Sequence, residues 1–201
     1  IEHAAYNADD TLTSKTTTKY DEQGRRIRRI ERDYDDHISR SSEYLYDDRG
    51  NLAEFAKCDN TDGEVLVKEI YQYDSDGEVL VKEIYGYNGV LQVKFSRDKI
   101  VEEGKTLMRH TTYHYSDDGS IFMLKHSVYD DNTLLREESY VDDVLTNRDV
   151  YEYDAEQRVT RVTSLSYGRE LTCEMLYRYD NDGRRVEMIK KGGDGSLKRH
   201  E

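Results

Sequence analysis

The sequence contains no proline, no tryptophan and only two cysteines, Cys58 and Cys173. The absence of proline excludes a proline-rich linker or tail. Two cysteines cannot form a disulfide framework, and they could pair only if the fold brings them together. No run of about 18 apolar residues occurs, so a transmembrane helix is not expected.

Basic and apolar residues are also scarce. There are 30 Lys and Arg against 43 Asp and Glu, which gives a net charge of −13. Nucleic acids and anionic membranes bind clustered Lys and Arg, so neither is expected as a partner. The basic run at 25–29 is interpreted as a strand whose arginines pair with neighbouring acids. Hydrophobic residues make up only 35%, including 18 tyrosines, which does not suit a thick core.

What the sequence does contain is an internal repeat, which decides the fold. The decapeptide DGEVLVKEIY occurs at 62–71 and again at 76–85. Looser copies are KYDEQG at 19–24, YLYDDRG at 44–50, YQYDSDG at 71–77, YHYSDDG at 113–119, YEYDAEQ at 151–157 and YRYDNDG at 177–183. Between these copies lie shorter turn-forming segments, which we call breaks together with the Asp-x-x-Gly segments: 35–36, 88–89, 130–132, 142–143 and 168–169. The aromatic residues before these breaks recur 12 or 14 residues apart where the series is unbroken, which indicates short strands joined by turns.

The breaks predict two kinds of turn. Asp-x-x-Gly suits a type I turn followed by a left-handed glycine, and Asn88-Gly89 suits a two-residue type I′ turn. Turns this short join only antiparallel neighbours. We therefore predict an all-β, antiparallel up-and-down meander of about 14 short strands, from near Leu12 to near Lys191.

The meander is expected to be either a closed barrel or a strongly curved single-layer sheet. Closure is favoured, because an open meander exposes two strand edges. Residues 11–191 are predicted to form a single β-repeat domain, and residues 1–10 and 192–201 are predicted to be frayed. Within the domain, residues 97–105 form either a long loop or an extra short hairpin.

Six Tyr-x-Tyr pairs contain 12 of the 18 tyrosines. Each pair ends a strand on one face, so a meander places most pairs near one rim of the sheet. One interpretation is an aromatic band that supplies the missing core. The other is a platform for carbohydrate or protein, because tyrosine offers a flat apolar ring and a hydroxyl. The ligand-binding residues would then be Tyr44, Tyr46, Tyr71, Tyr73, Tyr85, Tyr87, Tyr113, Tyr115, Tyr151, Tyr153, Tyr177 and Tyr179.

No residue pattern predicts catalysis, a metal site or a cofactor. The sequence has no Ser-His-Asp elbow, no glycine-rich phosphate loop and no CxxC pair. Residues 72–77 with Glu83 imitate a calcium loop only in part, because Gln72 holds its first position. His110 and His114 would lie about 13 Å apart on a strand, too far to chelate one ion. We therefore expect a protein that is not an enzyme.

The pattern Tyr-x-Tyr-Asp-x-x-Gly resembles the tyrosine-aspartate (YD) repeats of the RHS family, at 44–50, 71–77, 113–119, 151–154 and 177–184. Full copies here recur at about 26 residues, as from Tyr20 to Tyr46 or from Tyr153 to Tyr179, which is a longer period than the family's. No copy has the complete Gly-Arg-Leu ending. Such repeats build β-sheet shells around toxin domains or lie at cell surfaces. The sequence also looks similar to secreted bacterial domains of unknown function that form porin-like barrels.

These features lead us to expect a non-enzymatic binding or scaffold module, extracellular or at a bacterial cell envelope. It would contact carbohydrate or protein through its tyrosine-rich rim. Two alternatives stay open. One is a toxin-associated shell fragment or an acidic immunity-type interaction protein. The other is a small-ligand-binding β-barrel, which needs a lumen cavity of about 300 Å³ or more. The partner and the oligomeric state are left open.

Overall fold

In a computed structural model, the chain is described for residues 1–59, 64–166 and 172–200. The described residues form strands and turns and no helix, so among them no helix could span a membrane. Tyr167, Leu171 and the break at 168–169 lie outside the described residues. Cys58 and Cys173 are free thiols.

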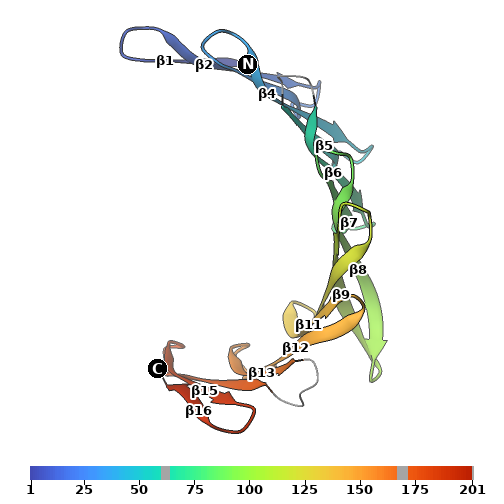
Figure 1. The fold of residues 1–201 in the computed structure, drawn as a ribbon, viewed down its shortest axis with the longest axis vertical. Coiled ribbons are helices and arrows are strands. Elements are labelled where there is room, and N and C mark those ends of the chain that lie inside the picture. The colour runs from blue at the N-terminus through green and yellow to red at the C-terminus, as the bar shows by residue number, and fades with distance from the viewer. Residues whose placement is uncertain (60–63, 167–171, 201) are drawn as a thin grey trace. The chain divides into compact units, whose positions relative to one another are not determined.

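The described residues form sixteen strands, which follow one another along the chain (Figure 1). They are β1 (Glu2–Tyr6), β2 (Leu12–Tyr20), β3 (Arg26–Arg32), β4 (Ile38–Tyr46), β5 (Leu52–Asp59), β6 (Val65–Tyr73), β7 (Val79–Tyr85), β8 (Leu91–Glu102), β9 (Lys105–Tyr115), β10 (Ile121–Asp130), β11 (Thr133–Val141), β12 (Val144–Tyr153), β13 (Val159–Ser166), β14 (Cys173–Tyr179), β15 (Arg185–Gly192) and β16 (Leu197–His200). The strand order in the sheet equals the chain order, which confirms the antiparallel meander.

The fourteen strands expected between Leu12 and Lys191 correspond to β2 to β15. The segments expected to be frayed each contain one further strand, β1 and β16. Their hairpins begin with Asn7 and Gly192 where most others begin with Asp, so the repeat did not reveal them. The strand order starts at β1 and ends at β16, so pairing among the described residues does not close the ladder into a barrel, against our expectation.

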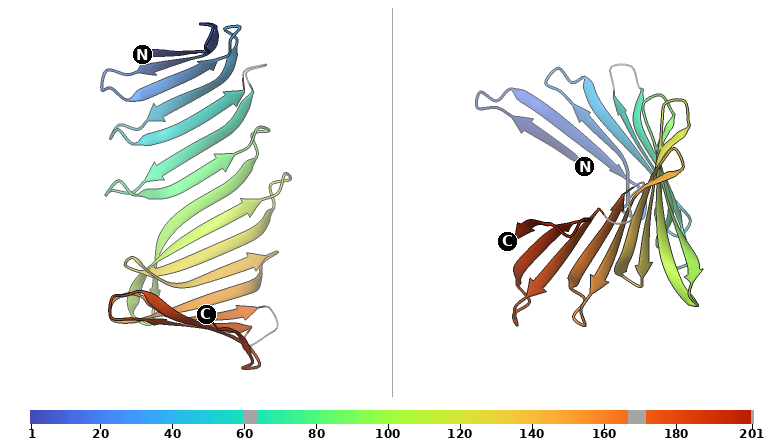
Figure 2. Two further views of the ribbon diagram at one scale, coloured as in Figure 1. Left: turned by 90° about the vertical axis from the view of Figure 1, so that its left-hand side faces the viewer. Right: turned by 60° about the horizontal axis from the view of Figure 1, so that its bottom comes forward.

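Contacts divide the chain into two compact units. Unit 1 comprises Ile1–Phe95 with Tyr115–Gly119, and unit 2 comprises Ser96–His114 with Ser120–Glu201. The boundary falls inside the range predicted as one domain. Within each unit, the described strands contact their neighbours in sequence and lie in a single layer (Figure 2). A single layer buries little, and the buried hydrophobic side chains among the described residues are Leu107, Val128 and Val162.

The Asp-x-x-Gly turns form as predicted. In the turn from β4 to β5, the Gly50 N–H donates to the Asp47 carbonyl at 2.9 Å, and Gly50 has a φ of 90°. The Asp47 carboxylate accepts the backbone N–H groups of Arg49 and Asn51 at 3.0 and 2.8 Å. The same arrangement recurs at Asp21, Asp33, Asp74, Asp154 and Asp180. Aspartate therefore fixes these turns by accepting two amides that would otherwise lack a partner.

The two-residue turn predicted at Asn88-Gly89 is wrong. The Gly86 N–H donates to the Val90 carbonyl at 3.0 Å, and the Gly89 N–H donates to the Gly86 carbonyl at 2.9 Å. This is the four-residue turn again, with Gly86 at the aspartate position. Residues 97–105 form neither the long loop nor the extra short hairpin that we considered. They comprise the end of β8, a turn in which Glu103 and Gly104 have positive φ, and the first residue of β9.

One unpaired residue follows these turns on the returning strand. Leu45 pairs with Glu54 and Tyr46 pairs with Leu52, so Ala53 is skipped. Such a bulge shifts every residue beyond it to the other face. Between β5 and β6 the bulge pairs Cys58 with Val65. Val65 therefore shares a face with Lys68 and Ile70, whereas simple alternation predicts the face of Val67.

Candidate functional site

The second tyrosine of four predicted pairs is bound to the backbone of the preceding strand. The hydroxyl of Tyr73 donates to the Leu52 carbonyl at 2.8 Å. The equivalent bonds run from Tyr46 to Arg26 at 2.8 Å, from Tyr153 to Leu134 at 2.7 Å and from Tyr179 to Val159 at 2.9 Å. Each acceptor lies at or next to the first residue of its strand. We call Tyr46, Tyr73, Tyr153 and Tyr179 the clamp tyrosines, because each ties its hairpin to the preceding one.

An arginine strengthens two of the clamps. Arg158 Nε donates to Asp154 Oδ2 at 2.7 Å, and its guanidinium lies 4.9 Å from the Tyr179 ring centre. Arg25 repeats this contact with Asp21 at 2.7 Å and with the Tyr46 ring at 4.5 Å. The backbone amide and the guanidinium of Arg158 hold the pKa of Asp154 below its usual value. The aspartate therefore shapes its own turn and positions an arginine under the next repeat's tyrosine.

In two pairs, the first tyrosine donates its hydroxyl to a carboxylate two residues earlier. Tyr71 donates its hydroxyl to Glu69, and Lys82 Nζ lies 3.0 Å from the same carboxylate. The same three residue types meet at Tyr85, Glu83 and Lys94, with both bonds at 2.9 Å. The hydroxyls of Tyr71 and Tyr85 therefore donate to a glutamate of their own strand.

The remaining predicted tyrosines differ in their contacts. The Tyr44 ring lies 5.2 Å from the Phe55 ring, and Tyr177 donates to Met175 Sδ at 3.5 Å. Tyr151 donates to Glu137 at 3.3 Å, and burial with the nearby negative charges of Glu137 and Asp149 raises the pKa of Tyr151 to about 12. Tyr113 and Tyr115 end β9 and are half-buried.

Most of the predicted tyrosines therefore stabilise the sheet, as the aromatic-band interpretation expects. Eleven of the twelve are half-buried, and only Tyr87 is exposed. Within unit 1 the pairs on β4 and β6 share one edge and one face, as predicted. Tyr85 and Tyr87 lie at the opposite edge, because β7 runs in the opposite direction.

Three tyrosines at that opposite edge of unit 1 are strongly exposed. They are Tyr6 at 61%, Tyr34 at 67% and Tyr87 at 69%. Each lies where an odd-numbered strand ends and turns into the next even-numbered strand. We call Tyr6, Tyr34 and Tyr87 the exposed-tyrosine edge, meaning the row of strand ends on that side of the sheet. Tyr6 and Tyr34 were missed because neither belongs to a Tyr-x-Tyr pair. The signal that could have found them is a single tyrosine before Asn7 or within Asp33–Asp36.

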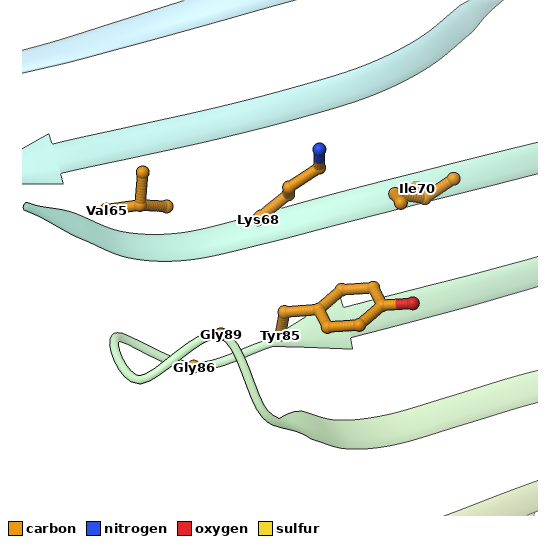
Figure 3. Close-up of a pocket in the computed structure, with 6 residues that line it drawn as sticks. All are labelled: Val65, Lys68, Ile70, Tyr85, Gly86 and Gly89. Carbon is orange, nitrogen blue, oxygen red and sulfur yellow. The ribbon is translucent and has the colours of Figure 1, made fainter.

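A pocket of about 280 Å³ lies beside this edge in unit 1 (Figure 3). Val65, Lys68 and Ile70 line it from β6, Tyr85 lines it from β7, and Gly86 and Gly89 line it from the turn. The lining is apolar apart from Lys68, whose Nζ lies 2.9 Å from Glu54 Oε2. No sequence pattern indicates this pocket, because it depends on the bulge that places Val65 on the same face as Ile70.

The arginines of the run at 25–29 make contacts within unit 1, although the Nε atoms of Arg28 and Arg29 are buried without a hydrogen-bond partner. Arg29 lies 2.8 Å from Glu31, and Arg28 lies 3.5 Å from Glu43 on the other face of the sheet. Arg26 lies 5.7 Å from the Tyr44 ring centre. This agrees with the interpretation of the run as a strand paired with neighbouring acids.

Unit 2 has an ion-pair network around one buried carboxylate, that of Glu138. Arg136 donates to both carboxylate oxygens of Glu102 at 2.6 and 2.5 Å. Glu138 is 8% exposed, lies 3.4 Å from Arg136 and accepts from Arg148 at 2.7 Å. Since each carboxylate has a guanidinium partner, the network balances its own charge.

Three histidines of unit 2, His126 and the two considered above as metal ligands, contact separate aromatic rings. His110 lies 4.7 Å from Tyr129, His114 lies 6.1 Å from Phe122, and His126 lies 5.5 Å from Tyr140. Burial, with the charge of Arg97, lowers the pKa of His110, and burial also lowers that of His126. Among the residues that the structure describes, no three His, Cys, Asp or Glu side chains are grouped as a metal site requires.

No protein-family model matches the sequence, and no curated protein matches it. Among solved structures, the fold is similar to a chain of the Tc holotoxin pore of Photorhabdus luminescens, at 14% identity and a TM-score of 0.32. That match covers 94% of this chain and only 12% of the toxin chain. A porin-like protein from Bacteroides uniformis matches at 13% identity and a TM-score of 0.43, over 98% of this chain and 84% of that one.

The identities and TM-scores are too low to transfer a function from either protein to this chain.

Proposed function

We propose that this chain is a non-enzymatic protein-binding module whose contact surface is the exposed-tyrosine edge of unit 1. The observation that carries the proposal is the contrast in tyrosine use. The clamp tyrosines donate their hydroxyls to backbone carbonyls. In contrast, the side chains of Tyr6, Tyr34 and Tyr87 are 61–69% exposed along one edge. Tyrosine combines a large apolar ring with a polar tip, which suits protein interfaces.

The charge of the chain indicates a basic partner. The net charge is −13, and exposed aspartates flank the edge at Asp9, Asp10, Asp35 and Asp36. Opposite charge across an interface speeds association and is screened by salt. Protein is favoured over carbohydrate for this reason. A location outside the cell or at a bacterial envelope stays a prediction.

The test is binding to peptide and glycan arrays at low and high salt. A Tyr6→Ser, Tyr34→Ser, Tyr87→Ser variant should lose binding to basic peptides. The matched control replaces three exposed apolar residues near the other edge of unit 1, Ile27, Leu45 and Leu80, with serine and should bind as the wild type does. Unchanged peptide binding by the tyrosine variant, or binding to glycans alone, would contradict the proposal.

A further inference from the structure

We propose that the pocket between Val65, Ile70 and Tyr85 receives one apolar side chain, the size of leucine or phenylalanine, from a basic segment of a protein partner. This inference rests on the proposed function and assigns it an anchor point.

The pocket lies at the point where the two copies of the repeat diverge. The first copy continues from Tyr71 as Gln-Tyr-Asp, and the second continues from Tyr85 as Gly-Tyr-Asn. Gly86 therefore stands where most of the four-residue turns have aspartate. Without that carboxylate, the turn offers the pocket only the backbone of Gly86 and Gly89.

The polar groups around the pocket already have partners. The Tyr85 hydroxyl donates to Glu83 at 2.9 Å, and Lys68 is paired with Glu54 at 2.9 Å. A sugar hydroxyl or a free ion would therefore lose hydration and gain only the remaining ammonium donors of Lys68 and the acceptor side of the Tyr85 hydroxyl. An apolar group has no hydrogen bonds to water to lose, and its transfer from water into the pocket is favourable.

The size of the pocket fits one side chain better than a whole small molecule. Pockets for drug-sized ligands span about 300–1,000 Å³ and bury most of the ligand. This pocket measures about 280 Å³, and its lining residues come from one layer of sheet. The rest of a ligand must then lie on the protein surface, where Tyr87 of the same turn is 69% exposed.

The acidic surface determines what flanks the anchor residue. With a net charge of −13, the chain favours Lys or Arg on either side of the inserted side chain. The probes are therefore three capped tripeptides: Lys-Phe-Lys, Lys-Ser-Lys and Glu-Phe-Glu.

The experiment is an NMR titration of the full chain that follows the backbone amide signals of Gly86 and Gly89. Lys-Phe-Lys should shift both signals in a saturable way, while the signals of Gly24, Gly50 and Gly77 in other turns stay in place. The other two peptides should bind about tenfold more weakly or worse, because each lacks the buried ring or the favourable charge.

The duplicated decapeptide supplies a matched control. Ile70→Ala should weaken Lys-Phe-Lys binding several-fold, whereas Ile84→Ala, the same residue in the same local sequence, should leave it unchanged, because only Ile70 lines the pocket. Val65→Phe fills the pocket instead of enlarging it and should abolish the shifts. Val65 is 38% exposed, so this change should leave the sheet folded.

The outcomes separate the anchor from the proposed function. Equal shifts with Lys-Ser-Lys, or equal losses for Ile70→Ala and Ile84→Ala, would overturn the anchor. Peptide binding that depends on Tyr6 and Tyr34 but leaves Gly86 and Gly89 unshifted would also overturn the anchor, and the binding module would stand. Failure of all basic peptides to bind would remove both.

Discussion

The same ten residues lead into the adjacent strands β6 and β7, and the two copies are followed by different turns. They pair with each other in opposite directions, with Lys68 opposite Tyr85 and Tyr71 opposite Lys82. Because residues opposite each other share a face, Tyr71 and Tyr85 point to opposite sides of the sheet. Both tyrosines still bind the glutamate two residues earlier. The comparison shows that this local arrangement is set within the decapeptide.

What differs between the copies is decided by the residues that follow. After the first copy, Asp74 closes the regular turn and Tyr73 reaches the Leu52 carbonyl. After the second copy, Gly86 starts the turn early, so Tyr87 falls within the turn and is 69% exposed. One tyrosine is thus structural and the other is available for contact.

Replacing each of these two tyrosines with serine should give the largest difference in the free energy of unfolding. Tyr73→Ser removes a half-buried ring and a hydrogen bond and should lower the free energy of unfolding by about 2 kcal/mol. Tyr87→Ser should change it by less than about 0.5 kcal/mol, because the side chain is exposed. Urea unfolding of both variants measures the difference. Equal losses would show that the clamp bond has no special role.

The glycines of the two turns should differ by a smaller amount. Gly77 has a φ of 85°, so Gly77→Ala should cost about 1 kcal/mol in backbone strain. In Gly86→Ala, the new methyl group meets the Gln92 side-chain amide, which is flexible and can move. We expect a change within about 0.5 kcal/mol for Gly86→Ala. The thermal midpoints of the two variants provide the comparison, with Gly86→Ala/Gln92→Ala as the control for crowding.

Glu83, in the second copy of the decapeptide, should give the smallest effect on the free energy of unfolding. Lys94 first, and then the Tyr85 hydroxyl, lower the pKa of Glu83 in the folded state. A lowered pKa stabilises the fold above the unfolded value of 4.5, and this contribution is lost as the pH falls below it. Since Lys94 is about one-third exposed, the contribution should be under about 1 kcal/mol.

Urea unfolding between pH 6 and pH 3 tests this expectation. Glu83→Gln should lose less stability than the wild type over that range, and Glu22→Gln, at an exposed turn position, should follow the wild type. A steeper loss in Glu83→Gln would contradict the assignment.

Strands and turns could be predicted because their signals are local. An Asp-x-x-Gly segment contains both the aspartate that accepts the amides and the glycine that takes the left-handed conformation. The turn at Gly86 was misjudged because Asn88-Gly89 imitates a different turn. The face of Val65 could not be predicted, since a bulge is a property of how two strands pair.

The site was predicted in part for the same reason. The Tyr-x-Tyr spacing located the aromatic residues, but whether a hydroxyl is used depends on an acceptor 19 to 21 residues earlier. Nothing near Tyr73 in the sequence indicates the Leu52 carbonyl. The exposure of Tyr6 and Tyr34 likewise depends on which edge their strands reach.

The direction of the clamp tyrosines has a consequence for how the chain is made. Each hydroxyl reaches back toward the N-terminus, to a carbonyl that has already been synthesised. A hairpin can therefore be locked by the next one as it leaves the ribosome, without waiting for distant segments. The clamp bonds therefore allow the described hairpins of each unit to assemble in the order in which they are synthesised.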